Sequence, residues 1–276
     1  MGPVGTVGAG IPALGFGTWD RKGEEGIAAI LHALEVGYRH LDTAQSYGTE
    51  DACGEAIARS SLPRDDVFVT TKVRQENFDP GRLRPSVEQS LEALQLDRID
   101  LLLLHWPARD DRLPMEVYLG QLAEVQDAGL ARLIGVSNFT IGLLDRASAI
   151  LGDRPIAANQ VEIHIYGQNS KLAAYCRAAG IPTVAYCPIA KGLGADDPVL
   201  ADIAAAHDAT WAQVALAFLI AEGHAAIPTS GDHERIASNF AAAALDLAAD
   251  EIARLRTLDR GQHLIDDRSW MPVWDS

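Results

Sequence analysis

Four ionisable side chains stand at or just beyond the ends of short apolar runs. They are Asp42, Tyr47, Lys72 and His105, within the segments 38–48, 67–72 and 100–105. Each run has the length and composition of a β-strand. If parallel strands bring these ends together, the amine and the carboxylate can hold the phenol ready to donate a proton, with the imidazole beside it. The residues therefore predict acid–base catalysis at one edge of a parallel sheet.

The elements that must position these residues form a regular alternation. Eight candidate strands cover 14–19, 38–42, 67–72, 100–105, 132–137, 156–161, 182–186 and 225–228. Helical patterns lie near 24–36, 50–59, 81–95, 115–127, 140–150, 168–179, 210–221, 232–240 and 250–258. Such alternation favours an all-parallel sheet, and 276 residues suit one (β/α)8 TIM barrel. We predict an α/β fold with a single domain over 1–276.

Glycines support the element boundaries. Gly37, Gly129 and Gly180 each follow a helical pattern and precede a strand. A residue with a left-handed backbone conformation is favoured at such a helix end, and glycine adopts it most readily. An open doubly wound sheet would usually carry a glycine-rich loop that opens a helix after its first strand. The glycine cluster at 8–13 instead precedes the first barrel strand, so we expect it to form a turn in an N-terminal hairpin.

Composition and charge limit the partners. The chain is 48% hydrophobic and 22% charged, as in ordinary globular proteins. Its net charge is −15 and its basic residues are dispersed, which argues against nucleic acid and anionic membranes as partners. The apolar stretches are too short for a membrane span, and the first residues lack a signal-peptide pattern. We expect a cytoplasmic location.

The cysteines predict neither a disulfide framework nor a metal site. Cys53, Cys176 and Cys187 are odd in number and lack C-x-x-C spacing. We expect buried free thiols and no bound metal.

Several segments together resemble the aldo-keto reductase family over essentially the whole chain. They are L-G-F-G-T-W, H-L-D-T-A-x-x-Y-G, the Lys72 strand, L-L-L-L-H-W-P, I-G-V-S-N-F, N-Q-V-E, A-Y-C-P-I-A-K-G, and I-P-T-S followed by R-I-A-S-N. The resemblance implies NAD(P)H-dependent reduction of aldehydes or ketones to alcohols.

The chemistry can also be argued from the four residues. A free tyrosine has a pKa near 10, and we expect the ammonium of Lys72 to lower the pKa of Tyr47. Asp42 would neutralise and orient Lys72, since an isolated buried ammonium is costly. Tyr47 would donate the proton to the carbonyl oxygen, which His105 would orient. Taken singly, each residue also has an ordinary structural reading, as an ion pair, a core histidine or a loop tyrosine.

The resemblance also implies a groove for the nicotinamide cofactor. Ser137, Asn138 and Gln160 would bond the carboxamide, and Tyr186 would stack on the ring. The segment 188–194 resembles the loop that crosses the pyrophosphate, where Lys191 would offset charge; a mobile surface loop is the alternative. The groove residues that we predict are Thr18, Trp19, Ser137, Asn138, Gln160, Tyr186, Pro188, Ile189, Lys191, Gly192, Thr229, Ser230, Gly231, Asp232, Arg235 and Asn239.

The segment 229–239 departs from the family pattern. Thr229 stands where the family usually has the lysine that contacts the adenosine 2′-phosphate. Arg235 is kept and can bond a phosphate bidentately or stack on adenine. Asp232 would repel that phosphate and accept from the ribose hydroxyl of NAD, although it can also simply cap the next helix. We predict NADP as cofactor, with NAD or dual use as the alternative.

Aromatic residues predict the substrate pocket. Trp19, Tyr47 and Trp106 would form an apolar wall, which Trp270 and Trp274 of a C-terminal substrate loop would close. Arg74 stands where the family often has tryptophan, and it would recognise a carboxylate or a hydroxyl-rich substrate if it does not point to solvent. The physiological substrate, the direction of the reaction and the oligomeric state stay open, with a monomer as the family default.

Three other functions are weaker. A non-catalytic, nicotinamide-binding regulatory protein on the same fold would not need all four of the ionisable residues. A short-chain dehydrogenase places its tyrosine and lysine four residues apart on a helix, whereas Tyr186 and Lys191 are five apart. A metal-dependent hydrolase needs more ligands than the core set of strand ends offers.

Overall fold

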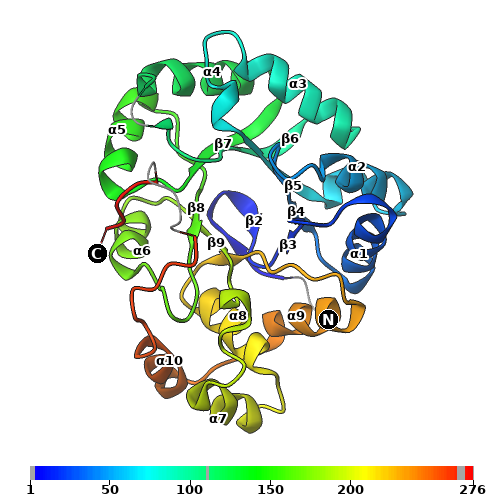
Figure 1. Cartoon of the computed structure of the whole chain (residues 1–276), viewed down its shortest axis with the longest axis vertical. Helices are drawn as coiled ribbons and strands as arrows, with labels where there is room; N and C mark the ends of the chain where they lie inside the picture. Colours follow the sequence, from blue (N-terminus) through cyan, green and yellow to red (C-terminus); the bar gives the residue numbers. More distant parts are fainter. Residues whose placement is uncertain (1–3, 110–111, 266–270, 276) are drawn as a thin grey trace.

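Eight parallel strands form the barrel that the apolar runs predict (Figure 1). The computed structural model describes residues 4–109, 112–265 and 271–275. The strands follow one another around the sheet in chain order, and every neighbouring pair is parallel. They are β3 (Phe16–Gly17), β4 (His40–Asp42), β5 (Phe68–Val73), β6 (Ile99–Leu104), β7 (Ala131–Ser137), β8 (Asn159–Glu162), β9 (Thr183–Tyr186) and β10 (Ala225–Ala226).

The first and last strands close the barrel. A parallel bridge joins Leu14 to Ala226. The N–H of Gly17 donates to the carbonyl of Pro228 over 2.9 Å. A Cβ on Gly17 would lie 2.8 Å from the carbonyl oxygen of Ile227, so this close approach requires glycine.

The expected N-terminal hairpin is present. β1 (Thr6–Val7) and β2 (Ile11–Pro12) pair antiparallel around a 3₁₀ turn, η1 (Gly8–Gly10). In Figure 1 the hairpin lies across the middle of the barrel in projection. Ile11 belongs to the same buried cluster as residues inside the barrel, so the hairpin plugs the N-terminal end.

Helices surround the strands, and every helix expected from the sequence is present (Figure 1). They are α1 (Gly23–Val36), α2 (Glu50–Arg59), α3 (Leu83–Leu94), α4 (Met115–Asp127), α5 (Ile141–Leu151), α6 (Ser170–Ala178), α8 (Trp211–Ala221), α9 (His233–Ala241) and α10 (Ala249–Arg256). Gly37, Gly129 and Gly180 have positive φ angles, as expected of these caps. The sequence patterns missed α7 (Pro198–Ala206), whose N-cap Asp197 accepts from two backbone N–H groups and is followed by proline.

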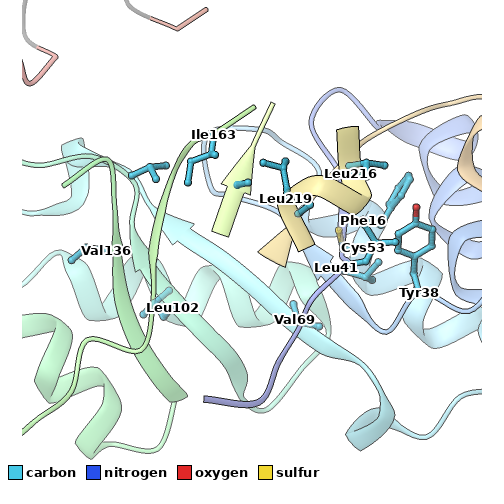
Figure 2. Close-up of a cluster of buried hydrophobic side chains, with 14 of the residues drawn as sticks. Phe16, Tyr38, Leu41, Cys53, Val69, Leu102, Val136, Ile163, Leu216 and Leu219 are labelled. Carbon is cyan, nitrogen blue, oxygen red and sulfur yellow. The ribbon is translucent and has the colours of Figure 1, made fainter. Parts of the chain in front are cut away.

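Successive side chains along each strand point alternately into the barrel and outward toward the helices, and this alternation determines where the polar side chains lie. On β6, Leu101 and Leu103 belong to the cluster inside the barrel, whereas Leu102 and Leu104 pack outward against helices. Figure 2 shows part of the outer layer, with Leu102, Val69 and Val136 among its members. By the same alternation, a polar residue two places from an inner residue points into the barrel.

Two of the cysteines match the expected burial. Cys53 and Cys176 are buried free thiols, whereas Cys187 is only half-buried. Within the described residues, no single helix has both the length and the hydropathy of a membrane span; α7 and α8 reach them only as a pair that is bent by 88°.

Candidate active site

Lys72 and Asp42 form a fully buried ion pair inside the barrel. Asp42 ends β4, and Lys72 lies two residues beyond Thr70 and four beyond the inner residue Phe68 on β5. The two side chains are at most 2% exposed, and Nζ lies 2.5 Å from Oδ1. One layer below, Nε2 of His40 lies 2.9 Å from the Thr70 hydroxyl. The strand alternation therefore places the ion pair above a polar layer of the barrel interior.

All three ammonium hydrogens of Lys72 have acceptors. Nζ donates to Asp42, to the carbonyl of Thr43 over 2.8 Å and to the Tyr47 hydroxyl over 3.3 Å. Burial opposes the charge, but the attraction of Asp42 and Tyr47 and the hydrogen bonds to them together outweigh it, and the pKa of Lys72 lies above its usual value. Lys72 therefore stays charged next to the phenol.

Tyr47 is held by this ammonium and by two rings. Its ring makes edge contacts with Trp19 and His105, at centroid distances of 5.0 and 5.5 Å. The expectation that its pKa would be lowered is wrong: burial raises the pKa of Tyr47 more than Lys72 lowers it. The difference arises because desolvation of the phenolate cannot be read from the sequence. The phenol is therefore protonated at neutral pH.

His105 completes the group at the end of β6. Its backbone N–H donates to the carbonyl of Val73, and its Nδ1 lies 3.2 Å from the Ser46 hydroxyl. Burial, together with the nearby Lys72 charge, holds the pKa of His105 well below its usual value. The ring is therefore neutral and carries one N–H donor. If Ser46 donates to Nδ1, the proton lies on Nε2.

The residues expected at the nicotinamide link five strand ends, those of β4, β6, β7, β8 and β9, into one network. Tyr186 donates to Asn138 over 2.8 Å, and Asn138 donates to the carbonyl of His105 over 2.9 Å. Ser137 donates to the backbone carbonyl of Gln160 over 2.8 Å. The side chain of Gln160 donates to Oδ2 of Asp42 over 2.6 Å. The predicted nicotinamide residues are thus bonded directly to the acid–base group.

The next two expected groove segments flank the barrel mouth. Thr18 donates through its hydroxyl to the carbonyl of Asp42, and the side chain of Trp19 is exposed. In the other segment, Pro188 is buried, Ile189 is half-buried, and a 3₁₀ turn, η5 (Ala190–Gly192), follows. Lys191 in this turn is exposed, and its Nζ donates to the carbonyl of Leu264 over 3.4 Å. It therefore contacts the C-terminal segment.

The segment 229–239 starts α9. Asp232 caps this helix by accepting from the N–H of Arg235 over 2.9 Å, which confirms the capping alternative. Nε of Arg235 donates to the Ser230 hydroxyl over 3.3 Å, while most of the guanidinium is exposed. Asn239 is buried further along α9.

Arg21 was not singled out in the sequence, yet it lies beside this segment. A Cβ on Gly231 would meet Nη1 of Arg21 at 2.3 Å, so the guanidinium packs where a side chain would stand. Its Nε donates to the carbonyl of Trp19 over 3.3 Å. Two guanidinium groups therefore pack against Ser230 and Gly231, the two residues that follow Thr229. Arg21 and Arg235 are more than 200 residues apart along the chain, so no local motif could reveal that they lie near the same segment.

The expected substrate residues fall into two places. The rings of Trp106 and Trp274 lie 6.5 Å apart, and Trp274 stacks on His263 at 4.8 Å. Arg74 is exposed and lines a polar cleft of about 140 Å³ with Gln45, Glu50, Asn77, Ser86, Gln89 and Ser90. Trp270 lies outside the described residues.

A second residue that the sequence argument passed over is Glu162. It closes the segment N-Q-V-E, two residues after Gln160, and its side chain is fully buried. The alternation of strand residues was the available signal, because it places both side chains on the inner face.

The comparisons with known proteins identify the family. The sequence model of the Aldo/keto reductase family matches residues 13–260. The methylglyoxal reductase DkgB of Salmonella typhimurium is 42% identical over 265 residues, which cover 96% of this chain and 99% of that protein.

Solved structures give the same result. A crystal structure provisionally assigned as a 2,5-diketo-D-gluconic acid reductase B is 40% identical, with a TM-score of 0.94 over 100% of this chain and 98% of the other. A Bombyx mori aldo-keto reductase in complex with NADP is 30% identical, with a TM-score of 0.90 over 98% and 97% of the two chains. The chain belongs to the aldo-keto reductase family.

Proposed function

We propose that this protein reduces the carbonyl group of small aldehydes and ketones to an alcohol, with a nicotinamide cofactor and with Tyr47 as the proton donor. The observation that carries the proposal is the buried Lys72–Asp42 pair, which holds an ammonium 3.3 Å from the hydroxyl of Tyr47. A purely structural pair would not need a phenol and an imidazole above it at the barrel mouth. Family membership supports the same reaction.

The residues divide the chemistry among them. The bound nicotinamide would supply a hydride to the carbonyl carbon. The neutral phenol of Tyr47 gives its proton to the carbonyl oxygen, and the ammonium of Lys72 stabilises the phenolate that remains. Asp42 keeps that ammonium charged and in place. A neutral His105 can donate its N–H to the carbonyl oxygen and so orient it.

The segment after β10 fits the phosphate end of such a cofactor. The Thr229 hydroxyl is buried and has no hydrogen-bond partner among the described residues. Arg235 contacts Ser230 and Arg21 packs against Gly231, so two guanidinium groups lie at this segment and can bind a phosphate. Asp232 accepts from its own helix, which occupies one carboxylate oxygen. We infer a preference for NADPH over NADH, and the NADP complex of the Bombyx mori relative supports it.

We infer that methylglyoxal and similar small dicarbonyl compounds are substrates. The support comes from the relatives named methylglyoxal reductase and from the aromatic ring of Trp19, which contacts the ring of Tyr47. The ring of Trp106, the residue after His105, adds a further aromatic surface. Contact between Arg74 and a substrate stays a prediction, since this residue lines a separate polar cleft.

The experiment is a steady-state assay of NADPH and NADH oxidation with methylglyoxal, simple aldehydes, diketones, keto acids and sugar-derived carbonyls. We expect turnover, with a higher kcat/KM for NADPH than for NADH and for small dicarbonyls than for sugars. Tight NADPH binding without oxidation by any of these carbonyls would favour a nicotinamide-binding regulatory protein instead.

A further inference from the structure

Glu162 at the end of β8 holds the C-terminal segment through a fully buried carboxylate. Oε1 accepts from the N–H of Leu264 over 2.7 Å and lies 3.1 Å from Nε2 of His164. Oε2 accepts from the N–H of Ile265 over 3.2 Å and lies 3.4 Å from Nδ1 of His263. Three of these four contacts reach residues about a hundred positions further along the chain. No step of the reaction proposed above uses Glu162.

The carboxylate remains charged although it is buried. Burial alone would raise its pKa, but the hydrogen bonds from His164, His263 and Leu264 outweigh this and lower the pKa of Glu162 to about 2. Charge-assisted bonds of this kind are roughly twice as strong as neutral ones. The contact is therefore a strong anchor for the segment.

A second anchor holds the other end of the segment. Oδ2 of Asp275 accepts from the N–H of Ile141, the first residue of α5, over 2.8 Å. Trp274 lies next to this anchor and stacks on His263 of the first one, with an interplanar angle of 12°. Its ring is 6.5 Å from Trp106, which directly follows His105. The two anchors thus bring one tryptophan of the chain end to the barrel mouth.

The Glu162 anchor also reaches the cofactor side. The carbonyl of Leu264 accepts from Lys191 of η5, and Glu162 pairs in register with Tyr186, the residue expected beneath the nicotinamide. The carboxylate therefore stands between the predicted substrate wall and the predicted cofactor groove.

We propose that Glu162 is a positioning residue that fixes the segment 262–265 and thereby sets Trp274 as a wall of the substrate site. The proposal rests on the proposed function for its kinetic consequence. Within the part of the chain that the structure describes, the carboxylate of Glu162 makes no hydrogen bond to Lys72, Asp42 or the Tyr47 hydroxyl. Its loss therefore affects the binding of the carbonyl substrate more than the chemical step.

The kinetic test compares Glu162→Gln with the wild type. We expect KM for methylglyoxal to rise about tenfold, kcat to change less than about threefold, and the Kd for NADPH, measured by fluorescence titration, to change less than about threefold. Trp274→Ala should raise KM similarly, and the double variant should add little to either single change. Unchanged KM in folded Glu162→Gln, or fully additive effects, would overturn the proposal.

Asp100→Asn is the matched control, because Asp100 is a buried carboxylate that also accepts from a backbone N–H but lies at the opposite end of the barrel. It should lower stability without raising KM. If Glu162→Gln does not fold, His263→Ala removes one contact of the same anchor together with the ring on which Trp274 stacks, and it should also raise KM. An unchanged KM in this variant would overturn the proposal.

Hydrogen exchange separates this proposal from the proposed function. The amides of Leu264 and Ile265 should exchange at least tenfold faster in Glu162→Gln than in the wild type, whether or not the protein reduces any carbonyl. Equal exchange rates would refute the anchor itself, whereas an inactive wild type with faster exchange in the variant would refute only the proposed reaction.

Discussion

The two ends of the barrel each contain a buried carboxylate with cationic partners, but in different surroundings. At the N-terminal end, Asp100 accepts from the N–H of Val69 and pairs with Arg64 and Arg132, whose side chains are 32% and 42% exposed. At the C-terminal end, Asp42 and Lys72 are both shielded from solvent. The first carboxylate keeps solvated partners, whereas the second places two charges in the barrel interior.

This difference in solvation distinguishes the carboxylate that supports the fold, Asp100, from the one that supports the reaction, Asp42. A buried ion pair is weak evidence for stability, because desolvation of both charges can cancel their attraction. The Lys72 pair is therefore better explained by its contact with Tyr47 than by its contribution to folding. The Asp100 cluster ties together the starts of neighbouring strands and needs no further explanation.

A cavity at the N-terminal end of the barrel lacks the chemistry of the C-terminal end. A cavity of about 210 Å³ lies near the N-terminal hairpin, lined by residues that include Gly8, Pro182, Thr183 and His224. Nδ1 of His224 is hydrogen-bonded to the Thr183 hydroxyl, and burial lowers the pKa of His224 to about 4. The imidazole is therefore neutral, and this nitrogen already has a partner. Charged groups in contact with a proton donor identify the candidate site better than volume does.

Tyr47→Phe, at the C-terminal end of the barrel, should cause the largest loss of activity. We expect kcat for carbonyl reduction to fall by roughly a thousandfold, because the variant lacks the proton donor. The Kd for NADPH and the midpoint of thermal unfolding should change little. Turnover close to that of the wild type would show that another group supplies the proton.

Lys72→Met should combine a catalytic and a structural loss. We expect kcat to fall by at least about a hundredfold and the free energy of unfolding to fall by roughly 3–5 kcal/mol, since Asp42 is left as an unpaired buried charge. The double variant Asp42→Asn, Lys72→Met should recover much of the stability and none of the activity. Recovery of both would mean that the pair is structural.

Asp100→Asn should produce only a structural loss. Replacing one charged acceptor should lower the free energy of unfolding by about 1–3 kcal/mol, as measured by urea denaturation. We expect kcat/KM for every accepted carbonyl to stay within about twofold of the wild type. A selective loss of activity would contradict the separation of the two ends.

Acid should remove the stability that the charged Glu162 carboxylate contributes at the C-terminal end of the barrel. The pKa of Glu162 is lowered from 4.5 to about 2, so its stabilising contribution is complete above pH 4.5 and is lost as the pH falls toward 2. Between these values, the free energy of unfolding of Glu162→Gln should depend on pH less steeply than that of the wild type, by at most about 1.4 kcal/mol per pH unit. Parallel curves would show that the carboxylate is not held in its charged form.

Most of the fold could be predicted because local patterns determine it. Eight apolar runs indicated the strands, and the position of Lys72 at the end of its run placed it at one edge of the sheet. The helix α7 had a signal in Asp197 and Pro198, but its alanine-rich sequence carries little amphipathic pattern. The anchor on Glu162 and the packing of Arg21 on Gly231 join residues 100 or more positions apart, and the raised pKa of Tyr47 depends on burial. Those features required coordinates.

The most direct test of the central claim is transfer of deuterium from NADPH labelled at C4 of the nicotinamide to methylglyoxal. Separate reactions would use the two stereochemical labels, and mass spectrometry would follow the alcohol product. We expect deuterium on the carbon of the new alcohol from one label and not from the other, and labelled alcohol to form roughly a thousandfold more slowly with Tyr47→Phe. A labelled product formed equally well by Tyr47→Phe, or no labelled product from the wild type with any carbonyl that it binds, would contradict the account.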